Sequence, residues 1–161
     1  MAAPSATARQ DPSGVFLGDG YKTLVTFAND PNIALWEDEV AAPGWEGDEP
    51  VETTNQHNDV LRTYSPGSLS RIPDATFTCQ YDPAVYDAVK DIINDPTTIT
   101  YRFPNQDTYA LYGYLRSFIP DNLSRGNRPQ ATVTITFTNQ DPTTCAEELP
   151  VYVAGSGTGG C

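Results

Sequence analysis

Strict alternation of apolar and polar residues is the clearest pattern in this chain. Residues 131–138 read ATVTITFT, with an apolar residue at every odd position and threonine at every even one. Residues 75–81, ATFTCQY, show the same period. A period of two predicts β-strands with one buried and one polar face. The same pattern places Cys79 on a buried face, where we expect an inert thiol.

Three further strand segments follow from composition and turn residues. Residues 21–28 and 33–40 are predicted as the first two strands, joined by the turn sequence NDPN. Residues 98–120 are predicted as a β-hairpin that turns at 104–107. Aromatic residues lie on both faces of its second strand, which indicates that a helix or another subunit covers the outer face.

One helix is predicted over residues 82–95. Asp82 is placed to cap its N-terminus, and Pro83 takes the first helical position, where a missing N–H costs nothing. An apolar stripe then repeats at helical spacing. The stripe consists of Val85, Ala88, Val89, Ile92 and Ile93.

The remaining segments carry no clear period, and the 161 residues are expected to form a single domain. Residues 1–19 are expected to be an N-terminal arm. Residues 41–58 are predicted as a long loop, and loops of this length tend to be functional or mobile. Residues 140–161 end in AGSGTGGC and are predicted as a flexible tail.

The charge balance narrows the function. The formal net charge is -12, from 21 acidic and 9 basic side chains. Such an excess argues against ordinary DNA binding and against docking on anionic membranes. It does not exclude a protein past which nucleic acid moves without sticking. The start MAAPSATARQ has no apolar run typical of a signal peptide, so we expect folding in the cytoplasm.

No catalytic, metal or cofactor site is expected. Asp48, Glu49, Glu52 and His57 lie close in sequence but lack the spacing of a zinc or calcium site, so a solvated acidic loop is the better interpretation. With 21 acidic residues, some glycosidase-like carboxylate pair always exists and carries no information. The chain has one histidine, and no serine lies in a GxSxG sequence.

Two aromatic and three basic residues leave alternatives open. Trp36 and Trp45 could bind sugar on a β-sandwich or anchor a protein interface. Arg116, Arg125 and Arg128 could pair with the acidic loop of a neighbouring molecule or be solvated.

Five sequence stretches, taken in order, resemble the major tail tube protein of long-tailed bacteriophages. The resemblance runs from about residue 18 to 153. The stretches are GDGYKT, PGWEGDEPVETTNQHNDVLRTYSPGSL, TCQYDPAVYDAVKDIIN, YGYLRSFIP and RPQATVTITFTNQDPTTCAEELPVY.

This resemblance implies a mostly β fold: a two-sheet β-sandwich or barrel with one flanking helix, a long inter-strand loop and extended termini. It also implies hexameric rings that stack into the tube of a virion tail. The tube would assemble in the host bacterial cytoplasm, and DNA would pass through it without specific binding. Proteins of the same fold build contractile-tail and secretion tubes. The implied partners are further copies of the chain, a tape-measure protein, a tail terminator and tail-tip proteins.

In this family the long loop reaches a neighbouring subunit or ring, so residues 41–58 are expected to be an assembly loop. The expected subunit or ring interface consists of Trp45, Glu46, Asp48, Glu49, Glu52, His57, Arg125 and Arg128. The alternative from another class is a secreted β-sandwich that binds carbohydrate or calcium as a monomer.

Cys145 and Cys161 are not part of the resemblance. We hypothesise a disulfide between them, within a subunit or between neighbours; free thiols in a reducing compartment are the alternative.

Overall fold

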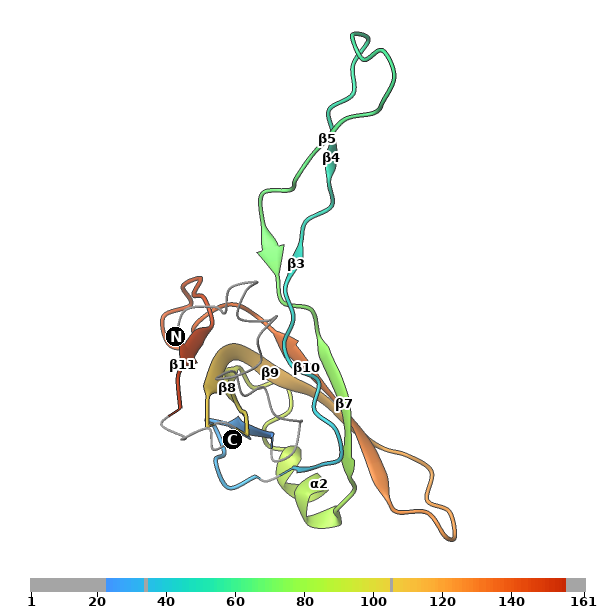
Figure 1. Cartoon of the computed structure of the whole chain (residues 1–161). Coiled ribbons are helices and arrows are strands. Elements are labelled where there is room, and N and C mark those ends of the chain that lie inside the picture. The colour runs from blue at the N-terminus through green and yellow to red at the C-terminus, as the bar shows by residue number, and fades with distance from the viewer. Residues whose placement is uncertain (1–22, 34, 105, 156–161) are drawn as a thin grey trace, which may run out of the picture.

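The computed structural model describes residues 23–33, 35–104 and 106–155. The N-terminal segment expected at 1–19 lies outside these ranges. A β-rich body carries one long projecting hairpin (Figure 1). The expected mostly β fold with one flanking helix is confirmed. The elements are β1 (Leu24–Phe27), β2 (Trp36–Glu37), β3 (Glu46–Gly47), β4 (Val51–Glu52), β5 (Tyr64–Ser65), β6 (Ser70–Arg71), β7 (Ala75–Gln80), α2 (Pro83–Val89), β8 (Thr97–Arg102), β9 (Thr108–Pro120), β10 (Gln130–Phe137) and β11 (Val151–Val153).

Seven strands form one antiparallel sheet in the order β1-β8-β9-β10-β7-β2, with β11 also paired to β9. The two end strands meet, because the backbone N–H of Val25 in β1 donates to Oε1 of Glu37 in β2 at 3.1 Å. The sheet therefore curls into a barrel-like body whose seam is bridged by a side chain. Burial raises the pKa of the Glu37 carboxyl there.

The core lies inside this curled sheet and follows the predicted alternation. In the β10–β7 pair, Val133 lies opposite Phe77 and Ala131 opposite Cys79, and all four side chains are buried. The other two inward positions predicted on β10, Ile135 and Phe137, are also buried.

The predicted hairpin at 98–120 is confirmed as β8 and β9. The pairing of β9 with β10 contains a β-bulge: Thr134 lies opposite Ser117 and Ile135 opposite Leu115, so Arg116 is the extra residue. The bulge shifts the inward phase of β9 by one residue. Leu115 and Phe118 consequently both face the core, three positions apart.

Helix α2 starts as predicted but ends early. The side chain of Asp82 accepts a hydrogen bond from the backbone N–H of Ala84 at 2.9 Å, and Pro83 is the first helical residue. The helix stops at Val89 instead of residue 95.

A contact with β9 explains the early end of the helix. The Asn94 N–H donates to the Leu115 carbonyl at 3.0 Å, and Ile93 forms a bridge with the same residue. Asn94 itself has a φ of 61°, outside the helical region. Pairing with the sheet thus replaces the last predicted turns, while Ile92 stays buried as expected from the apolar stripe.

The C-terminal segment is more ordered than the tail expected at 140–161. A bridge joins Gln140 to Glu147, and β11 pairs with the start of β9. The Asp107 carboxylate accepts hydrogen bonds from the Tyr152 hydroxyl and the Gly155 N–H, both at 2.7 Å. These contacts fasten the segment to the body as far as residue 155. In the described parts of the chain, no helix is long and apolar enough to cross a membrane.

Candidate assembly interface

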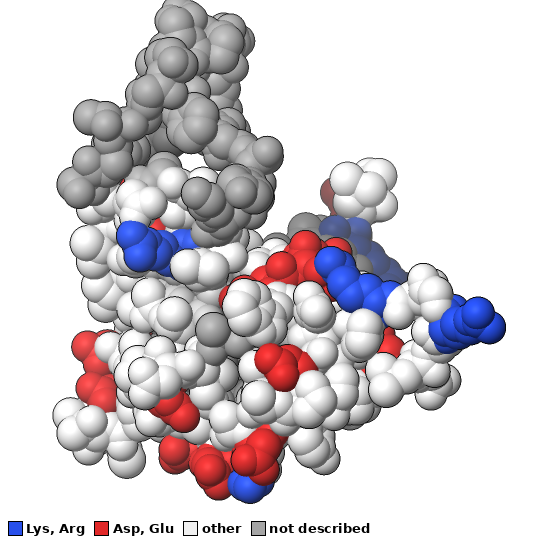
Figure 2. All heavy atoms as spheres, turned by 90° about the horizontal axis from the view of Figure 1, so that it is seen from below, with Lys and Arg blue, Asp and Glu red and all other residues white. Residues whose placement is uncertain are grey.

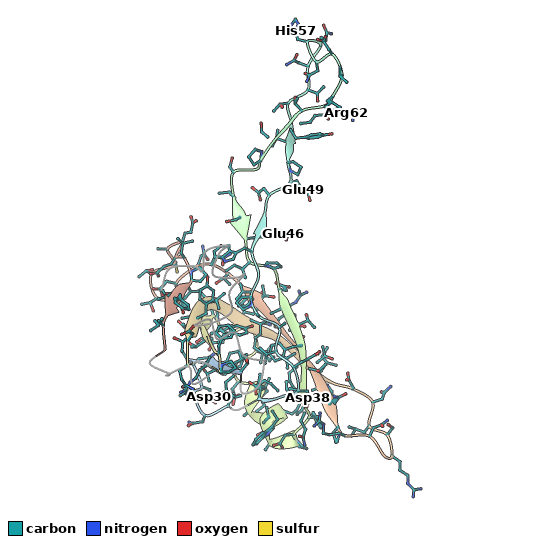
Figure 3. The ribbon with its side chains drawn as sticks, viewed as in Figure 1. Asp30, Asp38, Glu46, Glu49, His57 and Arg62 are labelled. Atoms are coloured by element: carbon teal, nitrogen blue, oxygen red, sulfur yellow. The ribbon has the colours of Figure 1, made fainter. Side chains whose placement is uncertain are left out.

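The projecting hairpin, residues 45–71, is called the arm below. At its base β3 pairs with β6, and further out β4 pairs with β5. Figure 3 shows Glu46 at the base, Glu49 and Arg62 farther along, and His57 at the tip. Within the loop expected at 41–58, residues 45–58 are thus the outgoing half of a β-hairpin, and residues 59–71 form the returning half.

Hydrogen bonds between the two halves continue past the short strands. The Asp48 N–H donates to the Leu69 carbonyl at 3.0 Å, and the Thr53 N–H donates to the Thr63 carbonyl at 2.8 Å. The hydroxyls of Thr53 and Thr63 also bond to each other at 3.0 Å. The arm is described throughout, and none of its residues is buried. It therefore holds its shape by internal pairing without a core of its own.

Asparagine side chains close the tip of the arm. The Asn55 N–H donates to Oδ1 of Asn58 at 2.9 Å, and the His57 N–H donates to Oδ1 of Asn55 at 2.8 Å. Such side-chain bonds are typical of tight turns. His57 is exposed here, and in the described ranges no three His, Cys, Asp or Glu side chains come together to hold a metal ion.

Three of the five acidic side chains of the arm have partners within it. Glu46 pairs with Arg71 at 2.7 Å and Glu52 with Arg62 at 3.9 Å. Exposed pairs of this kind contribute at most about 1 kcal/mol. Oδ2 of Asp48 accepts a hydrogen bond from the Leu69 N–H at 3.1 Å. The other two acids are Glu49 and Asp59.

Large apolar side chains are exposed along the whole arm. Val60 is 88% and Leu61 76% exposed. Single exposed apolar residues are normal on a protein surface, whereas larger exposed apolar surfaces occur at interaction sites, so the arm is a candidate interface. The exposed set is Trp45, Val51, Val60, Leu61, Tyr64 and Leu69. Of these, only Trp45 was singled out from the sequence.

The two arginines of the expected interface, Arg125 and Arg128, lie far from the arm. They belong to the loop between β9 and β10, and Figure 1 places this loop and the arm at opposite ends of the molecule. Arg128 pairs with Asp38, whose other oxygen accepts a hydrogen bond from Nε2 of Gln130 at 3.0 Å. Arg125 lies in the turn between Ser124 and Asn127, which is closed by a 2.8 Å side-chain bond. Within one chain, the expected interface residues therefore form two separate groups.

The two cysteines in the described ranges lie in different environments. Cys79 is fully buried, and its pKa is raised to about 11 by burial and by the carboxylates of Glu37 and Asp38. Cys145 is exposed in a turn, with a φ of 56°. Cys161 lies outside the described residues, so the disulfide hypothesis stays a prediction.

The surface charge of the body reflects the excess of acidic residues in the sequence. Figure 2 shows the face seen from below, on which acidic side chains form several groups with basic side chains at scattered points among them. This face lacks the continuous basic surface with which proteins neutralise phosphates.

Comparison with known proteins finds solved structures of similar fold. No family model and no curated protein matches the chain. One similar solved structure is a chain of the six-fold symmetrised anti-feeding prophage baseplate: 11% identity and TM-score 0.55, covering 82% of this chain and 91% of that one. Another belongs to the extended sheath–tube complex of an extracellular contractile injection system: 12% identity and TM-score 0.59, covering 94% of this chain and 99% of that one. At these identities the likeness shows the fold, which this chain shares with components of phage-like injection systems.

Proposed function

We propose that this chain is a structural, non-enzymatic subunit of a phage-like tail tube that assembles with copies of itself through the arm. The observation that carries the proposal is the arm itself, a hydrogen-bonded hairpin with six large exposed apolar side chains and no core. Burying such a surface against another subunit stabilises an assembly by roughly 25 cal/mol per Å² of apolar area. The shared fold adds the class of assembly in which the arm would act.

The finer features of the proposal come from the sequence resemblance. We take the assembly to be stacked hexameric rings in a virion tail, formed in the bacterial cytoplasm. The rings would surround a tape-measure protein, and tail-terminator and tail-tip proteins would bind the two ends of the tube. The resemblance is to long-tailed phages, whereas the similar structures belong to a contractile injection system and a prophage baseplate. A hollow tube is the form common to tail and injection tubes.

Charge supports the passage of DNA through this tube without binding. The chain carries a net charge of -12, and each stacked ring would multiply it. Like charge between the tube wall and phosphates limits sticking during transit.

Negative-stain electron microscopy of the purified protein over a range of concentrations tests this function. Rings or hollow tubes of uniform width are expected. A protein that stays monomeric at every concentration and instead binds a glycan or calcium would establish the alternative, a carbohydrate- or calcium-binding module.

A further inference from the structure

Arg125 differs from the other basic residues of the described chain. Each of the others bonds to a carboxylate or amide oxygen of its own chain: Arg62, Arg71, Lys90, Arg102, Arg116 and Arg128. Within the described ranges, Arg125 makes no hydrogen bond or ion pair. A guanidinium carries five donors in a planar fork that matches a carboxylate, so this side chain is available for one.

The turn that carries Arg125 is built and partly apolar. Gly126 takes the left-handed backbone region with a φ of 86°, and the Asn127 N–H donates to the Ser124 carbonyl at 3.3 Å. On the same hairpin, Leu123 is 67% exposed and Ile119 is 61% exposed. The end of the β9–β10 hairpin therefore presents one unpaired cation, and the same hairpin carries two exposed apolar side chains.

The tip of the arm presents the complementary chemistry. Asp59 has no hydrogen bond or ion pair to any described residue, and it is followed by Val60 and Leu61, the two most exposed large apolar residues of the described chain. One surface thus combines an unpaired carboxylate with two aliphatic side chains, and the other combines an unpaired guanidinium with two more.

The two surfaces cannot meet within one chain, because they lie at opposite ends of it (Figure 1). Between two copies, a contact of the arm tip with the β9–β10 turn leaves one free tip and one free turn. Such a head-to-tail contact repeats, and it produces rings if it closes and filaments if it does not.

We propose that the β9–β10 turn of one copy receives the arm tip of a second copy, with Asp59 paired to Arg125 and Val60 and Leu61 packed on Leu123 and Ile119. This inference rests on the proposed self-assembly and names the surface on the receiving copy. Apolar contacts around the ion pair exclude water, which strengthens the attraction between the two charges and makes like charges at the same place costly.

Charge exchange tests the pairing. Arg125→Glu and Asp59→Arg each place like charges together, and each is expected to raise the concentration needed for tube formation at least about tenfold. The double variant Asp59→Arg/Arg125→Glu restores opposite charges and is expected to assemble within about threefold of the wild type. Glu147→Arg reverses an exposed acid outside both surfaces and serves as the matched control. Sedimentation and electron microscopy give the assembly concentration, and circular dichroism confirms that each variant folds.

The outcomes separate this inference from the function on which it rests. Single variants that assemble like the wild type, or a double variant that is not restored, would overturn the pairing while the tube function stands. A wild type that never assembles would overturn both.

Discussion

At the residue scale, Tyr101 stands out in the core. Its side chain is fully buried, yet its hydroxyl has no hydrogen-bond partner among the described residues. A buried polar group without a partner costs about 1–3 kcal/mol. The ring fills the core between β1 and β9, where Tyr101 lies opposite Val25 and Tyr109. The hydroxyl therefore lowers stability while the ring supports it.

Tyr101→Phe keeps the ring and removes the hydroxyl. We expect the free energy of unfolding to rise by about 1 kcal/mol, measured by denaturant titration. Tyr64→Phe, at an exposed position on the arm, is the control and should leave it unchanged. A clear loss of stability in Tyr101→Phe would contradict this account.

The difference in stability between the wild type and Tyr101→Phe is expected to depend on pH. Burial raises the pKa of Tyr101 above its value of about 10 in the unfolded chain. The unfolded state therefore loses this proton first, so the stability linked to Tyr101 is present below about pH 10 and falls above it. The advantage of Tyr101→Phe should widen between about pH 10 and 11, and an unchanged difference would argue against a buried phenol.

Cys79 is expected to be unreactive in the folded protein. With a pKa of about 11 and no exposed surface, it has almost no accessible thiolate at pH 8. In a Cys145→Ser/Cys161→Ser variant, a thiol reagent should label nothing under native conditions and one thiol in denaturant. Rapid native labelling would show that the core opens at β7.

At the scale of the elements, what the sequence could predict depended on burial. β7 and β10 were predicted because each has a buried face, which requires alternating apolar residues. The halves of the arm have no buried face, so they carry no such period, and the returning half was missed. Its available signal was turn chemistry: Gly47 and Pro50 before the tip mirror Pro66 and Gly67 after it. The end of α2 depends on a contact with β9, which no local pattern reports.

Substitutions at two glycines, Gly113 in the body and Gly67 in the arm, test these two parts of the fold separately. A Cβ at Gly113 would lie 2.4 Å from the Thr136 carbonyl oxygen and 3.0 Å from Cα of Phe137, both backbone atoms of β10. A Cβ at Gly67 would lie 2.3 Å from Cβ of Asp48, across the arm. An alanine at either position would therefore clash with its neighbours, in the body at Gly113 and in the arm at Gly67.

Gly113→Ala is expected to lower the free energy of unfolding by about 2–3 kcal/mol, because β9 and β10 must separate. Gly67→Ala should change it by less than about 0.5 kcal/mol but impair assembly, because it distorts only the arm. Gly44→Ala, where a Cβ meets nothing within 4 Å, is the control for both. If Gly67→Ala destabilised the body as much as Gly113→Ala, the arm would not be an independent element.

At the scale of the whole molecule, the sequence predicted an assembly loop at residues 41–58, but the geometry of this segment was not predictable. Sequence distance does not show that the arm and the β9–β10 turn lie at opposite ends. Nor does it show that Arg128 pairs with Asp38, so that Arg125 is the unpaired basic residue among those that the structure describes. The elongated shape places the arm and the β9–β10 turn at opposite ends, and in the proposed assembly one copy adds to the next through these two ends.

Removal of the arm tests the central claim most directly. A variant in which Asn-Gly replaces residues 48–69 joins β3 to β6 by a two-residue hairpin turn. Because no buried residue is lost, its body should unfold at the wild-type temperature. Electron microscopy of the two proteins at equal concentration is the measurement: hollow tubes from the wild type and only monomers from the variant are predicted. Tubes formed by the armless variant would contradict the account.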